Sequence, residues 1–230
     1  MSGGRVYRRF MHKEAVFRIC CEPFAAVTAE IVRQRRILEG YIERHPEFGT
    51  SFEPLEVLVD APESAQQMAR AAGLAGVGPM AAVAGAMAQL AGEAGLAAGA
   101  DEVVVDNGGD IYLRTIEPIV VSLHSGTARI GDRLGFSIRP EQTPLAVCSS
   151  SGRMGHSTSL GDCDLATVVA RDAALADAAA TRAANMVKAV EDVDAALEAI
   201  AAIPGINGVL IVKADRVGMA GKLPEMVRID

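Results

Sequence analysis

The stretch between residues 101 and 170 constrains the fold most, because it has the pattern of consecutive strands. Apolar segments cover residues 101–106, 111–113, 118–124, 133–138, 145–149 and 165–170, with turn-forming residues at most of the breaks. The sharpest turn signal is Asn107-Gly108-Gly109-Asp110, a pattern typical of a hairpin. Strands that follow one another through turns pair antiparallel. The pattern therefore predicts an α+β fold with an antiparallel sheet rather than alternating βαβ units.

The flanking segments complete this prediction. Further strands are expected over residues 5–10, 14–21, 55–59, 206–212 and 216–219, and helices over residues 23–44, 62–72, 80–98, 173–190 and 193–203. The last residues are expected to form a tail. Half of the chain is hydrophobic but only 4% is aromatic, and alanine dominates several helices, so we expect long Ala-rich helices packed closely through small side chains. We expect one α+β domain over residues 1–230.

Charge and cysteine usage exclude several classes of protein. The formal net charge is −7, and the absence of a long run of Lys or Arg argues against a nucleic-acid partner. The four cysteines form no CxxC pair, and the N-terminus lacks the pattern of a secretory signal. These features predict reduced thiols and a cytoplasmic protein.

One apolar run, residues 77–100, is long enough to be considered as a membrane span. It contains Gln89 and Glu93 and is rich in alanine and glycine, which favours a buried helix over a span. Helices with such small side chains also suit close packing between subunits, so a homo-oligomer stays an open alternative.

The segment from Ser149 to Asp162 has the composition of a loop that binds an anion. Its glycines and small hydroxyl residues leave backbone N–H groups free to point at a phosphate. His156 lies within it, and the unperturbed pKa of a histidine is close to neutrality, so His156 is the candidate general base. The alternative is an exposed loop histidine that only donates a hydrogen bond.

The helix after this loop carries the candidate metal ligands. Asp177 and Thr181 are four residues apart, which places both oxygens on one helix face. Hard oxygen ligands suit Mg²⁺, which takes one or two carboxylates and leaves its other positions to phosphates and water. The alternative is a solvated polar stripe that continues through Asn185 and Lys188. A phosphate-binding loop followed by a Mg²⁺-binding helix predicts a site for a phosphorylated ligand.

Three segments, in this order and spacing, resemble the ApbE-like superfamily, whose typical members are FAD:protein FMN transferases. Residues 75–80, Ala-Gly-Val-Gly-Pro-Met, resemble the Gly-rich start of a family helix, and residues 105–111, Val-Asp-Asn-Gly-Gly-Asp-Ile, are similar to the turn Asn-x-Gly-Gly-Asp-Ile. Ser150-Ser151-Gly152 resembles Thr-Ser-Gly, and residues 176–181 resemble the metal motif Ala-Asp-Ala-x-Ala-Thr.

The resemblance implies a T-fold-like α+β architecture with bound Mg²⁺ and a flavin nucleotide, FAD or FMN. It implies that Asp177 and Thr181 hold the metal. The residues implied to bind the flavin nucleotide are Gly78, Asn107, Gly108, Gly109, Asp110, Ser150, Ser151 and Gly152.

The chain departs from typical members in three places. Gly78-Pro79-Met80 stands where they carry Ala-Lys-Gly, so the lysine is missing, and the acidic residue that follows in them falls near Ala84 here. Residues 155–159 replace their His-Ile-x-Asp-Pro segment. Two functions follow from the resemblance. One is Mg²⁺-dependent transfer of FMN from FAD to a hydroxyl of an acceptor protein, with His156 as the catalytic residue. The other is binding of a flavin or other nucleotide without transfer, in a short branch of the superfamily.

Overall fold

The computed structural model describes residues 4–123, 134–151 and 161–229. Its largest element is an eight-stranded sheet with the order β1-β2-β3-β4-β7-β8-β9-β10. The strands are β1 (Arg8–His12), β2 (Ala15–Cys20), β3 (Val103–Asn107), β4 (Asp110–Arg114), β7 (Leu145–Ser150), β8 (Leu165–Ala170), β9 (Ile206–Lys213) and β10 (Arg216–Gly221). Every neighbouring pair is antiparallel, which confirms the predicted α+β class.

A second, smaller sheet has the order β11-β6-β5. Its strands are β5 (Ile119–Leu123), β6 (Leu134–Ile138) and β11 (Glu225–Arg228). The predicted C-terminal tail is therefore wrong, because β11 hydrogen-bonds along β6 with Met226 opposite Phe136. The predicted strand over residues 55–59 is also wrong. Leu58 and Val59 are exposed there, and the segment pairs with no strand among the described residues.

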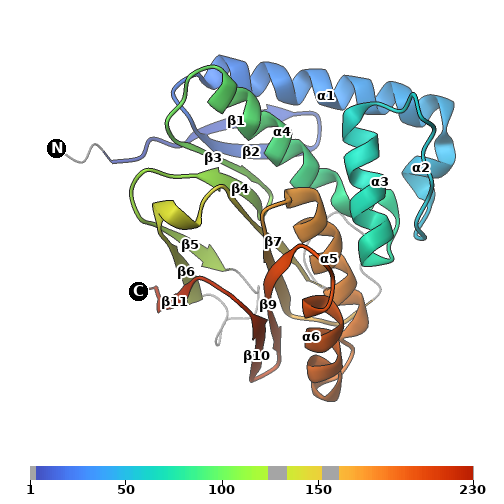
Figure 1. Cartoon of the computed structure of the whole chain (residues 1–230), viewed down its shortest axis with the longest axis vertical. Helices are drawn as coiled ribbons and strands as arrows, with labels where there is room; N and C mark the ends of the chain where they lie inside the picture. The colour runs from blue at the N-terminus through green and yellow to red at the C-terminus, as the bar shows by residue number, and fades with distance from the viewer. Residues whose placement is uncertain (1–3, 124–133, 152–160, 230) are drawn as a thin grey trace.

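The helices lie on one side of the eight-stranded sheet, and the smaller sheet lies on the other (Figure 1). They are α1 (Phe24–Arg44), α2 (Pro46–Thr50), α3 (Glu63–Ala75), α4 (Val83–Ala97), α5 (Ala173–Met186) and α6 (Val193–Ala201). A 3₁₀ turn over Pro79–Ala82, η1, leads into α4. Asp172 caps α5 by accepting the N–H of Leu175 at 3.0 Å. The helix ends at Met186, earlier than predicted, because Val187 is extended.

Strand alternation divides the core into two parts. Val103 and Val105 face the helices, whereas Val104 faces the smaller sheet. Within the described ranges, Pro79–Ala97 is the one helix long and apolar enough to cross a membrane, and half of its apolar window is buried. It packs against α1, α5, β3 and β4, as a core helix does.

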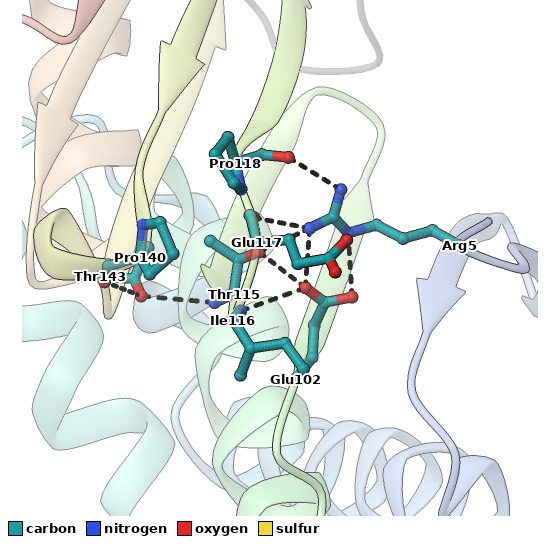
Figure 2. Close-up of polar contacts among 8 residues, drawn as sticks. All are labelled: Arg5, Glu102, Thr115, Ile116, Glu117, Pro118, Pro140 and Thr143. Carbon is teal, nitrogen blue, oxygen red and sulfur yellow. Dashed lines mark hydrogen bonds and ion pairs between the residues drawn. The ribbon is translucent and has the colours of Figure 1, made fainter. Parts of the chain in front are cut away.

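Arg5 joins the N-terminal segment to the chain between the two sheets (Figure 2). Its guanidinium donates to both carboxylate oxygens of Glu102, at 2.9 and 2.8 Å, and to the Thr115 hydroxyl at 2.7 Å. It also donates to the carbonyls of Glu117 and Pro118, at 2.7 and 3.1 Å. These bonds fix the segment that leaves β4 and enters β5.

Candidate functional site

The β3–β4 hairpin presents bare backbone to open space. Gly108 and Gly109 adopt φ values of 70° and 106°, a left-handed region that favours glycine, and they join the paired residues Asn107 and Asp110. A Cβ atom at either glycine would meet nothing within 4 Å. Asp106 stabilises the turn, because its Oδ1 accepts the Gly109 N–H at 2.9 Å. A planar or anionic ligand can therefore approach the turn closely.

A cavity of about 700 Å³ lies beside this turn, between the two sheets. Its polar lining comprises Gly108, Gly109, Asp106, Arg18, Tyr7, Ser122, Ser149, Ser150 and Ser151, and its apolar lining comprises Val16, Val104, Ile111, Ile119, Val120, Val121, Leu123, Val147 and Leu165. Hydroxyls and turn backbone beside apolar walls suit a ligand with one polar and one apolar part.

Asp177 lies on the helix side of the sheet, where α4 begins. Its side chain is only 8% exposed, so the alternative of a solvated stripe is wrong for this residue. Its Oδ2 accepts the Gly85 N–H at 2.9 Å, and the Ala84 N–H also bonds to the carboxylate. Free N–H groups in the first turn of a helix stabilise a negative charge. The side chain of Asn107 donates to the Ala84 carbonyl at 3.2 Å, which connects the hairpin to the same turn.

Asp110 is a second buried carboxyl group near Asp177. Burial raises its pKa well above the usual value, and the charge of Asp177 raises it further, whereas hydrogen bonds from Cys148 and the Ser149 N–H lower it. Burial likewise raises the pKa of Asp177 to about 7, against the lowering effect of the two amides. The Oδ1 atom of Asp110 is buried and has no hydrogen-bond partner among the described residues. Such an atom is costly in a folded protein unless a ligand or proton satisfies it.

The other predicted residues are distributed as follows. Thr181 is partly exposed, one turn beyond Asp177 on α5. Ser150 and Ser151 line the cavity with the two hairpin glycines. Gly78 is absent from the described lining; a Cβ there would lie 1.9 Å from the Ser51 carbonyl oxygen, so close packing explains this glycine. Gly152 and His156 lie outside the described residues, and their roles stay predictions.

Two residues of the site were missed from the sequence. Gly85 allows α4 to approach α5, since a Cβ there would lie 2.1 Å from the Ala173 carbonyl oxygen and 2.9 Å from the Cβ of Asp177. The Cys148 thiol lies 3.6 Å from the same carbonyl and bonds to Asp110. The small residues of the predicted helix over residues 80–98 indicated close helix packing but did not single out Gly85, and nothing in the sequence indicated that Cys148 lies beside Asp110.

Known proteins resemble this chain over nearly its full length. The family model described as AbpE bacteria matches residues 10–218. The chain belongs to this family. The UPF0280 protein of Methanocella arvoryzae is 41% identical over 228 residues, which cover 95% of this chain and 93% of that protein. The UPF0280 protein of Methanocaldococcus jannaschii is 40% identical, over 87% of this chain and 83% of the relative.

Solved structures share the fold. The flavin transferase ApbE from Vibrio cholerae superposes with a TM-score of 0.57 at 15% identity, covering 94% of this chain and 96% of that one. The ApbE protein from Thermotoga maritima gives a TM-score of 0.58 at 13% identity, covering 98% and 97%. The ApbE-like resemblance noted in the sequence is therefore confirmed, and with it the α+β fold with an antiparallel sheet and long helices.

Proposed function

We propose that this protein is a flavin nucleotide transferase, which uses Mg²⁺ to move FMN from FAD to a hydroxyl of an acceptor protein. The observation that carries the proposal is the position of Asp177. Its buried carboxylate lies at the start of α4, close to Asp110. The β3–β4 hairpin contacts the start of α4 through Asn107, and its two glycines line the cavity of about 700 Å³. The Vibrio cholerae protein of the same fold is a flavin transferase, which agrees with this proposal.

The donor atoms fit Mg²⁺. Asp177 supplies a carboxylate and Thr181 a hydroxyl from the same helix, and both are hard oxygen donors. No group of three or more His, Cys, Asp or Glu side chains capable of holding a metal occurs in the parts of the chain that the structure covers. A Mg²⁺ site does not require such a cluster, because Mg²⁺ keeps several waters or phosphate oxygens and needs few protein ligands.

The residues of the chain have separate roles in this proposal. The apolar walls between the sheets bind the ring system, and the backbone of Gly108 and Gly109 lies against the nucleotide. The serines that end β7 donate hydrogen bonds to phosphate oxygens. His156 takes the proton from the acceptor hydroxyl as it attacks the phosphorus atom, and AMP leaves with the electrons of the broken P–O bond. A divalent cation held by Asp177 and Thr181 would supply positive charge that offsets the negative charge of the phosphates.

A second candidate function is flavin or nucleotide binding without transfer. The specific observation in its favour is Gly78-Pro79-Met80, where typical members have a lysine that this chain lacks. We also propose that the chain works as one domain in the cytoplasm, alone or as a homo-oligomer.

One experiment separates the two functions. The purified protein is incubated with FAD and Mg²⁺, with and without candidate acceptor proteins, and AMP and protein-bound flavin are measured by chromatography and mass spectrometry. Transfer predicts equal amounts of AMP and covalently bound FMN, and neither product should form when EDTA is present from the start. Tight FAD binding with no AMP would favour the binding function, and absence of any flavin binding would overturn both.

A further inference from the structure

Asp110 comes from strand β4 and Asp177 from helix α5, and both side chains lie between the eight-stranded sheet and the helices. Asp110 begins β4 and lies directly opposite Cys148 of β7 in the sheet register. Cys148 belongs to the helix-side core, and directly opposed residues of neighbouring strands point to the same face. The Asp110 side chain therefore points toward the helices, away from the cavity between the sheets.

Helices α4 and α5 contact the sheet close to Cys148. The Cys148 thiol lies 3.6 Å from the Ala173 carbonyl oxygen, and Ala173 precedes Asp177 by one turn of α5. A Cβ at Gly85 would touch both Ala173 and Asp177, so these groups form one contact region. Helix α5, which carries Asp177, also packs against β4, the strand that begins with Asp110.

Two independent features of this region indicate a cation. The first is the pairing of two carboxyl groups that are each only 8% exposed, which is unfavourable unless positive charge is supplied. The second is Oδ1 of Asp110, a buried oxygen without a hydrogen-bond partner among the described residues. No Lys, Arg or His forms an ion pair with either residue within those residues.

We propose that Asp110 is a second carboxylate ligand of the divalent cation, with its free Oδ1 facing the ion that Asp177 holds. This assignment rests on the proposed function, because it concerns the same metal site. In this proposal Asp110 binds the cation. The sequence resemblance instead implied that Asp110 contacts the nucleotide. It also makes the site a junction of β4 and α5 rather than a feature of α5 alone.

The test measures binding of Mn²⁺, a paramagnetic substitute for Mg²⁺, to the full chain by electron paramagnetic resonance. Asp110→Asn keeps the size of the side chain but removes its charge. Because loss of groups that only support metal ligands costs about 10–100-fold in affinity, loss of a direct ligand should weaken Mn²⁺ binding by at least about tenfold. Asp101→Asn is the control, since it removes a carboxylate charge from an exposed position outside the hairpin, and the Mn²⁺ affinity of this variant should stay within about threefold of the wild type.

The outcomes separate this inference from the proposed function. If Asp177→Asn loses Mn²⁺ while Asp110→Asn binds it like the wild type, Asp110 is not a ligand and the proposed function stands. If both variants bind normally, or the wild type binds no Mn²⁺ with or without FAD, the metal site itself is overturned. Thermal melting in EDTA checks folding: Asp110→Asn should melt at or above the wild-type temperature, because it relieves charge repulsion. Asp110→Ser provides a second folded variant that also lacks the carboxylate.

Discussion

Gly85 donates its backbone N–H to Oδ2 of Asp177 at 2.9 Å, so the first turn of α4 holds a carboxylate that α5 supplies. The same glycine has no room for a side chain against Ala173. The close approach of the two helices and the binding of the carboxylate therefore depend on one residue, and the candidate metal site is built into the packing of the helices.

Replacing Gly85 with alanine should destabilise the protein by about 1–3 kcal/mol, because the new methyl group overpacks the contact with the Ala173 carbonyl. The matched control is Gly73→Ala in α3, where a Cβ meets nothing within 4 Å. That change should stabilise by about 0.5–1 kcal/mol, since alanine is the better helix former. Urea unfolding followed by circular dichroism measures both. Equal effects of the two substitutions would contradict the packing described here.

The stability of the metal-free protein should depend on pH through Asp177. The pKa of this group in the folded state is about 7, above the value of about 3.9 expected in the unfolded chain. The folded state therefore binds the proton more tightly, and its stability falls as pH rises from about 4 to 7, by at most about 1.4 kcal/mol per pH unit. The difference in unfolding free energy between wild type and Asp177→Asn in EDTA should show this slope. A difference independent of pH would exclude a buried, proton-binding Asp177.

Glu102→Gln should destabilise the protein by about 1–2 kcal/mol, because it removes the charged acceptor of a bidentate bond from Arg5 (Figure 2). Arg5 and Thr115 lower the pKa of Glu102 despite its partial burial, so this contribution is lost as the pH falls below about 4. Glu141→Gln is the control, since its ion pair with Arg139 is exposed and should contribute less than about 0.5 kcal/mol. Similar losses of unfolding free energy in both variants would show that the Arg5–Glu102 contact stabilises the protein no more than an exposed ion pair does.

Most elements could be predicted because their signals are local. The Asn107–Asp110 hairpin follows from its two glycines, and the start of α5 follows from Asp172 as its cap. β11 could not be predicted, since its short segment becomes a strand only by pairing with β6. The segment over residues 55–59 shows the opposite outcome, because its apolar pattern is typical of a strand but the segment pairs with no described strand.

The candidate site could be predicted only in part, because its geometry depends on contacts far apart in sequence. The spacing of Asp177 and Thr181 suggested a ligand pair, but the burial of Asp177 depends on the close approach of α4 at Gly85. Gly78 was predicted from a motif, whereas the structure explains it through packing against Ser51. Whether it also contacts a ligand stays a prediction.

Asp177 is proposed to hold a cation that a flavin nucleotide needs for binding. Isothermal titration calorimetry of FAD binding to wild type and Asp177→Ala, each with Mg²⁺ and with EDTA, tests it most directly. We predict that Mg²⁺ tightens FAD binding to the wild type by at least about tenfold, and that Asp177→Ala loses this gain while staying folded. An unchanged Mg²⁺-dependent affinity in Asp177→Ala would contradict the account.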